Sequence, residues 1–144
     1  MSSTGNTSSR RAMARKLAMQ ALYRWQINPA PWQDLLTEFS EEEDMPKADL
    51  EYFTLLVREC TEHSAKLDEA MTELLDRAPA TLDPIEHALL WIGTFELQHC
   101  PDVPFRVVIN EAVRLAKRYG ATDGHKYLNG VLDRAARQWR VHER

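Results

Sequence analysis

Basic side chains gather just before and within the first predicted helix. Arg10, Arg11 and Arg15 carry guanidinium groups, and Lys16 follows directly. Arginine binds phosphate oxygens through paired hydrogen bonds, and each such contact with a nucleic acid releases counterions, so that binding weakens with salt. Tyr23 falls on the same helical stripe as Lys16, away from the apolar side, where a ring is suited to stack on unpaired bases. The segment predicts an RNA-contacting surface, with packing of Tyr23 on a neighbouring helix as the open alternative.

A second basic and aromatic pair stands near the start of the last predicted helix. Lys126 and Tyr127 follow Asp123, which is placed to cap that helix. A cation beside an aromatic ring again suits phosphate and base contacts. The alternative is the ordinary first turn of a helix, and the residues alone leave both interpretations open.

Catalysis and metal binding find no support in the residue pattern. The chain contains no P-loop, no GxGxxG, no GxSxG and no HExxH motif. The histidines have no second ligand at helical spacing, and the adjacent His99 and Cys100 would not converge on one ion from a helix. We therefore expect that the protein is not an enzyme and that it binds no metal and no cofactor.

The elements that must position these residues are helices. Apolar residues recur with a helical period from residue 11 onwards, and no period-2 run between turn signals predicts a strand. We expect an all-α protein of about seven helices, with a disordered tail at residues 1–9 and a single domain at residues 10–140. The expected helices cover residues 11–26, 32–39, two within 48–75 that are separated near 61–64, 84–99, 105–119, and a last one after residue 123.

Several helix ends are marked by their residue types. Asp83, Pro84 and Glu86 occupy the N-cap, N1 and N3 positions of a helix start. Gly120 stands where a left-handed residue commonly ends a helix.

Cys60 and Cys100 have no partner motif and are expected to be buried thiols in a reducing compartment, which indicates the cytoplasm.

The charge is distributed unevenly along the chain. Its net value is −4, but residues 1–28 hold five basic and no acidic side chains, whereas residues 29–100 hold four basic and 17 acidic ones. Residues 101–144 hold nine basic and five acidic side chains. Two basic ends thus flank an acidic middle, which we expect to face away from any RNA, although ordinary scatter of surface charge is an open alternative.

Two blocks of sequence resemble the NusB family of bacterial antitermination factors. Residues 11–26, RAMARKLAMQALYRWQ, are similar to its Arg-rich opening, which ends in a QALY.WQ phrase. The second block, residues 102–133, contains DVPFRVVINEA at 102–112 and DGHKYLNGVLD at 123–133, which are similar to the family's INEA and HKF.NGVLD phrases. The resemblance extends over about residues 10–137.

The resemblance implies a fold of two three-helix bundles plus a further helix, with no catalytic activity and no cofactor. It also implies a heterodimer with NusE, which is a small-subunit ribosomal protein, and binding of this pair to the boxA element of nascent RNA. The pair would join RNA polymerase and the other Nus factors in an antitermination complex that reads through terminators, notably in ribosomal RNA operons.

The family's site residues are carried over only where this sequence matches. Glu86 matches a position at the NusE contact, and we expect it to be partly exposed so that it serves both as a cap residue and as a contact. Ala12 and Met13 replace part of an arginine run, which weakens the predicted affinity of this segment, and Gly124 replaces a common serine. The expected RNA-binding residues are Arg10, Arg11, Arg15, Lys16, Tyr23, Lys117, Asp123, Lys126 and Tyr127, with Arg118 as a further compensating cation.

Two other functions remain as alternatives. A NusB-like domain also precedes the catalytic domain of certain ribosomal RNA cytosine methyltransferases, but this sequence contains no cofactor-binding sheet. The second alternative is a helical scaffold that binds only protein through its acidic surface.

Overall fold

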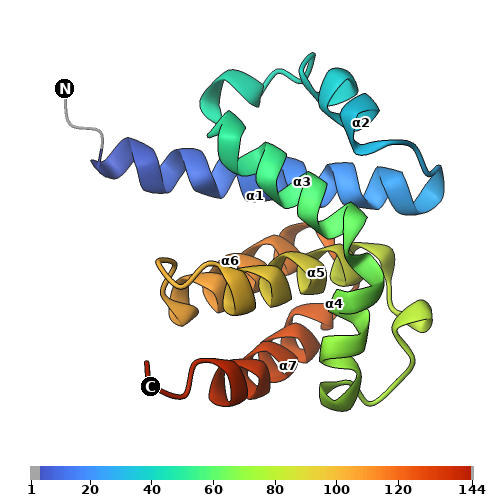
Figure 1. The fold of residues 1–144 in the computed structure, drawn as a ribbon, viewed down its shortest axis with the longest axis vertical. Coiled ribbons are helices and arrows are strands. Elements are labelled where there is room, and N and C mark those ends of the chain that lie inside the picture. The colour runs from blue at the N-terminus through green and yellow to red at the C-terminus, as the bar shows by residue number, and fades with distance from the viewer. Residues whose placement is uncertain (1–3, 144) are drawn as a thin grey trace. The chain divides into compact units, whose positions relative to one another are not determined.

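The computed structural model describes residues 4–143, with side chains from residue 7, and within this range it contains seven α-helices and no strand. The all-helical prediction is therefore confirmed. No helix of the described part is both long and apolar enough to cross a membrane. In chain order (Figure 1) the elements are α1 Thr4–Ile27, α2 Trp32–Phe39, η1 Met45–Lys47, α3 Leu50–Glu62, α4 Ser64–Met71, η2 Thr72–Leu74, η3 Pro79–Thr81, α5 Pro84–His99, α6 Phe105–Tyr119 and α7 Gly124–Trp139, where η marks a 3₁₀ turn.

The expected ends of α2, α5 and α6 are confirmed, whereas α1 is longer than expected. It begins at Thr4, so residues 4–9 are helical and not a disordered tail. The difference has a physical reason, because extending an existing helix adds one hydrogen bond for each residue fixed and needs no tertiary contact. The expectation of disorder for residues 1–3 lies outside the described residues.

The chain divides into two compact units, and the first of them ends at Glu62. Within it, α1 packs mainly against α3, and α2 packs on both (Figure 1). Leu22, Leu35 and Phe53 are fully buried among these helices. Asp49 caps α3 by accepting a hydrogen bond from the backbone N–H of Tyr52 at 3.0 Å. Leu50, which the apolar pattern includes, is 59% exposed as the first residue of α3, although Tyr52 and Phe53 in the same turn are buried.

The second unit begins at His63 and contains α4 to α7. Helices α5, α6 and α7 pack against one another, and α4 packs on α5 (Figure 1). Helix α5 is buried over most of its circumference, as its apolar sequence predicts. A single carboxylate oxygen joins α4 to α5, because Asp68 Oδ1 lies 2.7 Å from His87 Nε2 and 2.8 Å from Trp91 Nε1.

The helix-end predictions succeed at α5 and fail at the turn between α6 and α7. The Asp83 carboxylate accepts hydrogen bonds from the backbone N–H groups of Ile85 and Glu86, as expected. Gly120 is extended, with φ −88° and ψ −177°, so the left-handed assignment was wrong. The left-handed residue is Asp123, with φ 65°, and it makes no side-chain capping hydrogen bond. The turn therefore uses Gly120 for a reason other than its φ.

Candidate nucleic-acid interface

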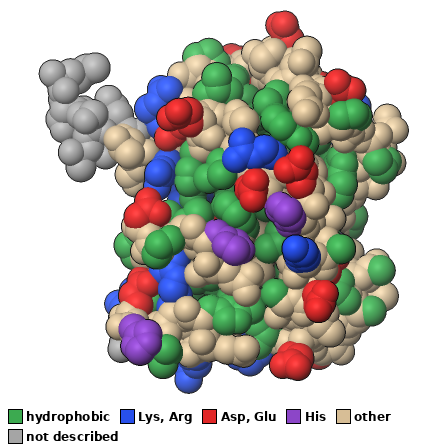
Figure 2. Space-filling view, viewed as in Figure 1, with side chains coloured by type: hydrophobic (Ala, Val, Ile, Leu, Met, Phe, Trp, Pro, Cys, Tyr) green, Lys and Arg blue, Asp and Glu red, His purple; other side chains and the backbone are tan. Residues whose placement is uncertain are grey.

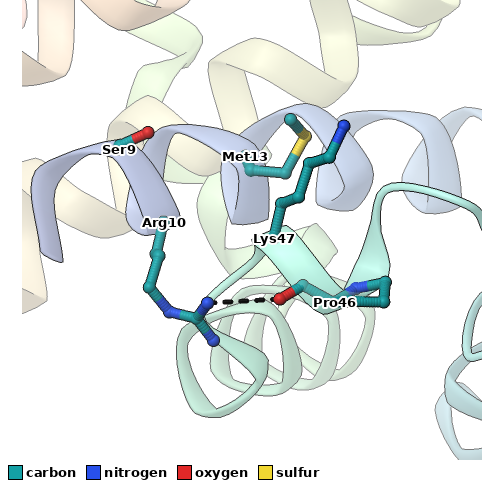
Figure 3. A pocket seen from close by; sticks show the side chains of 5 residues that line it. All are labelled: Ser9, Arg10, Met13, Pro46 and Lys47. Carbon is teal, nitrogen blue, oxygen red and sulfur yellow. Dashed lines mark hydrogen bonds between the residues drawn. The ribbon is translucent and has the colours of Figure 1, made fainter. Parts of the chain in front are cut away.

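Arg10, in the second turn of α1, is held by the turn that precedes α3. Its guanidinium donates to the carbonyl of Pro46 at 3.2 Å and to that of Ala48 at 2.7 Å. The Arg10 carbonyl in turn accepts a hydrogen bond from the backbone N–H of Asp49 at 3.0 Å. Figure 3 shows the Arg10–Pro46 contact beside a hollow of about 380 Å³, which is lined by Ser9, Arg10, Met13, Pro46 and Lys47.

The next two arginines of α1 face the ring of Tyr52 on α3. The Cζ atom of Arg11 lies 4.3 Å from the centre of this ring, and that of Arg15 lies 5.4 Å from it. Arg11 also approaches Asp49, with Nε and Oδ2 4.0 Å apart. Arg15 is only 4% exposed. The structure therefore places Arg15 in the interior of its unit, not on the surface that the sequence analysis expected, because Tyr52 packs over it.

Lys16 is paired with the acidic segment. Its Nζ atom lies 2.8 Å from Asp44 Oδ2. The hydrogen bond from Lys16 and its positive charge lower the pKa of the Asp44 carboxyl, with a smaller contribution from Lys47. The acidic middle is expected to face away from any RNA, but Asp44 and Asp49 lie beside Lys16 and Arg11 in the segment that is predicted to contact RNA. The turn at η1 brings these carboxylates to α1, where the opposite charges attract each other. The space-filling view likewise shows blue and red side chains next to each other in several places (Figure 2).

Two further predicted residues lie on helix surfaces. Tyr23 is 42% exposed on α1, as its place on the helical stripe away from the apolar side predicts. Lys117 is exposed on α6 and lines an open hollow of about 660 Å³. The other residues that line this hollow are Asn110, Val113, Arg114 and Arg118. This part of α6 therefore presents three cationic side chains together.

The start of α7 leaves its cation in solvent. The Lys126 side chain is 72% exposed, and its Nζ atom lies 3.5 Å from Asp123 Oδ1, whose side chain is 66% exposed. Pairs this exposed contribute only about 0–1 kcal/mol, so Asp123 restrains Lys126 weakly. The structure thus brings Asp123 and Lys126 together, and the lysine is open to an incoming phosphate.

Tyr127 meets two residues that sequence reasoning did not single out. The Cζ atom of Arg77 lies 4.3 Å from the centre of the Tyr127 ring. The backbone N–H of Asp76 donates to Tyr127 Oη at 3.4 Å. Burial raises the pKa of the Tyr127 phenol. Asp76 and Tyr127 are 51 positions apart in the sequence, so no local spacing indicates their contact.

Glu86 on α5 is buried, with 5% exposure, which corrects the expectation of partial exposure. Its Oε2 atom accepts a hydrogen bond from the backbone N–H of Ala121, in the turn that precedes α7, at 3.1 Å. The pKa of Glu86 is raised to about 7, mainly by burial and in smaller part by the negative charge of Asp83, while the Ala121 hydrogen bond acts in the opposite direction. Glu86 therefore connects the start of α5 to the turn that carries Asp123.

Two glycines make room for this carboxyl group. A Cβ atom at Gly120 would lie 2.2 Å from Glu86 Oε2 and 2.8 Å from the carbonyl oxygen of Ala116. A Cβ atom at Gly124 would lie 2.6 Å from Glu86 Cδ. Close approach, and not a positive φ, thus explains Gly120, and a side chain at Gly124 would meet the same carboxyl group.

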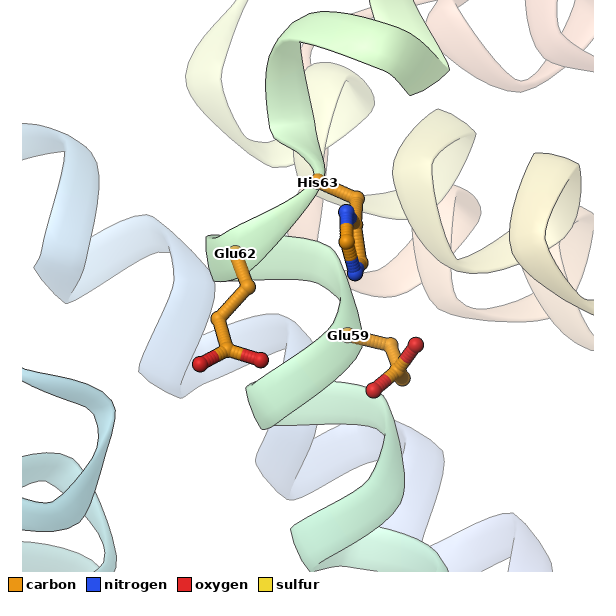
Figure 4. A group of neighbouring side chains, drawn as sticks. All are labelled: Glu59, Glu62 and His63. Atoms are coloured by element: carbon orange, nitrogen blue, oxygen red, sulfur yellow. The ribbon is translucent and has the colours of Figure 1, made fainter.

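Figure 4 shows Glu59 and Glu62 at the end of α3, with His63 directly after them in the chain. Both carboxylates have protein partners. Glu59 Oε2 lies 3.1 Å from Arg58 Nε, and Glu62 Oε2 accepts a hydrogen bond from the Trp32 indole at 3.2 Å. These contacts account for the two acidic side chains, and we do not assign a metal to them.

Fold and surface together define an all-helical protein with basic and aromatic residues along its first helix and at the start of its last helix. The model of the NusB family matches residues 12–137, and the chain belongs to this family.

Curated relatives agree over most of the chain. The transcription antitermination protein NusB of Hydrogenovibrio crunogenus is 48% identical over 88% of this chain and 78% of its own length. That of Thiobacillus denitrificans is 46% identical over 92% of each chain.

Solved structures show the same fold. NusB of T. maritima superposes with a TM-score of 0.75 at 28% identity and covers 88% of this chain and 90% of its own. A crystal structure of the antitermination factors NusB and NusE in complex with double-stranded RNA contains a chain that superposes with a TM-score of 0.74 at 26% identity, over 90% of this chain and 98% of that chain.

Proposed function

We propose that this protein is a transcription antitermination factor that binds the boxA element of nascent ribosomal RNA transcripts together with NusE. The observation that carries the proposal is membership of the NusB family over residues 12–137, with a structural relative that binds NusE and RNA. The complex would help RNA polymerase, with the other Nus factors, to read through terminators. The role is one of binding and not of catalysis, and action on nascent RNA places the protein in the cytoplasm.

The RNA contacts are proposed to come from both predicted segments. Lys126 offers a solvent-exposed ammonium group for a phosphate, and Tyr23 offers an exposed ring for an unpaired base. Arg11 is partly exposed and can turn towards a phosphate, whereas the buried Arg15 is proposed to support this part of α1 beside the ring of Tyr52. The remaining proposed contacts are Arg10, Lys16, Lys117, Asp123 and Tyr127.

NusE is proposed to dock near the start of α5, where the family resemblance places Glu86. The Glu86 carboxylate is buried and bonded to Ala121, so it would act on NusE by holding the surrounding surface in place. Acidic residues on the exposed surface suit a basic ribosomal protein.

The test is fluorescence anisotropy of a labelled boxA RNA and a scrambled control, titrated with this protein with and without NusE at two salt concentrations. We expect a preference for boxA that strengthens with NusE and weakens with salt. Absence of binding under all these conditions would overturn the RNA-binding function and favour a scaffold that binds only protein.

A further inference from the structure

The loop after η2 carries an arginine that is aimed at a predicted RNA-contacting ring. Arg77 Nε donates to Asp76 Oδ1 at 2.7 Å, and Nη2 donates to Oδ2 of the same carboxylate at 3.4 Å. The guanidinium lies over the ring of Tyr127, and its side chain is 50% exposed. The group is thus oriented by the chain itself while half of it remains in contact with solvent.

Contacts that do not involve Arg77 also hold this loop in place. Arg134 on α7 donates from Nη2 to the carbonyl of Leu74 at 2.7 Å, and the Asp76 backbone N–H bonds Tyr127 Oη. Tyr127 and Arg134 are seven residues apart, which is about two helical turns, so they share one face of α7. An exposed cation–π contact and an exposed ion pair each contribute at most about 1 kcal/mol. Holding the loop therefore does not explain why an arginine stands over the ring.

We infer that Arg77 binds the RNA phosphate next to the base that meets Tyr127, and that the two side chains form one recognition unit. The inference rests on the proposed function and extends it by a residue outside the two segments that the sequence indicates. The Asp76 carboxylate holds the edge of the guanidinium that Nε and Nη2 form, so a phosphate would use the N–H groups of Nη1 and the second N–H of Nη2. Lys126, next to Tyr127 in the chain, supplies a second cation at the same place.

The charge pattern explains why this arginine stands out. Arg77 is one of only four basic residues in the acidic stretch 29–100, and the structure puts it on the ring of Tyr127, next in the chain to the exposed Lys126. A ring with a cation above it suits a nucleotide better than a protein surface, because the phosphate and the base of one nucleotide can use both groups.

The experiment measures binding of labelled single-stranded boxA RNA, in the presence of NusE, to the full chain and to the variants Arg77→Ala, Arg77→Lys, Tyr127→Ala and Arg77→Ala/Tyr127→Ala. Arg137→Ala is the matched control, because its side chain is 67% exposed and also pairs with an aspartate, Asp133, at 3.0 Å. We expect Arg77→Ala to weaken binding about 5–10-fold and to reduce the salt slope by about 0.7, which is the value for one phosphate contact on a single strand. Arg77→Lys should fall between Arg77→Ala and the wild type, because lysine keeps the charge but not the planar fork.

Arg137→Ala should change affinity less than about twofold, since it removes an equal charge without a proposed contact. The double variant should lose less than the sum of the two single losses, because the side chains act as a unit. Equal behaviour of Arg77→Ala and Arg137→Ala, with normal wild-type binding, overturns the inference and leaves the proposed function standing. No binding by the wild type overturns the proposed function and this inference with it.

Discussion

Residues 10–16 of α1 and the start of α7 both carry basic side chains but differ in how those side chains are held. In α1, Arg10 and Lys16 are bonded to the segment around η1, and Arg15 is buried. At α7, Lys126 is 72% exposed and only weakly paired. The cations of α1 therefore make contacts within the protein, whereas Lys126 at the start of α7 is exposed to solvent.

The difference teaches that the number of cations in a segment does not measure what an RNA can reach. Acidic residues such as Asp44 partly neutralise the richer segment, so an RNA phosphate must compete with a carboxylate that is already in place. The start of α7 has fewer cations, but Lys126 there can bind a phosphate without first breaking a close ion pair. Its position depends instead on how Glu86 and two glycines pack beneath the turn before α7.

The largest effect is expected from Gly120→Ala, which tests that packing. The backbone at φ −88° admits alanine, but the new Cβ would lie 2.2 Å from Glu86 Oε2 and 2.8 Å from the Ala116 carbonyl oxygen. We expect a loss of about 3 kcal/mol in the free energy of unfolding, measured by urea denaturation. The matched control is Gly130→Ala in α7, where the nearest atom to the new Cβ is 3.5 Å away and helix propensity favours alanine by up to about 1 kcal/mol. Equal stabilities for the two variants would show that the turn does not depend on close packing.

Glu86→Gln probes the same turn through pH. Burial raises the pKa of Glu86 to about 7 from 4.5, so between these values the folded state holds a proton that the unfolded state has released. Wild-type stability should therefore fall as pH rises through this window and level off above it. Glutamine keeps an oxygen to accept the Ala121 hydrogen bond and carries no charge.

Relative to the wild type, Glu86→Gln should accordingly be about 2–3 kcal/mol more stable at pH 8 and about equally stable near pH 4, below the unfolded pKa. Thermal or urea unfolding at both pH values gives the comparison. A variant whose stability follows the wild-type pH curve would show that another group is responsible.

The smallest effect separates the two regions directly, by comparing Lys126→Ala with Lys16→Ala in RNA titrations at several salt concentrations. Lys126 is exposed, so its loss should weaken binding a few-fold and lower the salt slope by about 0.7. Lys16 is paired with Asp44, so its loss should change the slope less. A larger slope change for Lys16→Ala would reverse the comparison and make residues 10–16 of α1 the main phosphate-binding region.

The predictions from sequence succeeded where local rules decide. The bounds of α2, α5 and α6 follow from proline, aspartate and apolar periodicity, and the Asp83 cap forms as its residue type indicates. The prediction for Gly120 was wrong because a glycine satisfies two different needs, a positive φ or a close approach, and only the neighbouring Glu86 shows which one applies. The sequence did not predict a role for Arg77, because its contact with Tyr127 joins distant parts of the chain.

By itself the sequence determined the helical class, the order of the helices and the family. Helix periodicity, capping residues and family motifs each depend only on residues that are close together in the sequence. Tertiary structure alone decided which charged groups are available. Arg15 and Lys126 are both cations in the first turns of an amphipathic pattern, yet one is 4% exposed and the other has a side chain that is 72% exposed. Burial and ion pairing depend on what the rest of the chain places beside each side chain, and that information is not contained in local spacing.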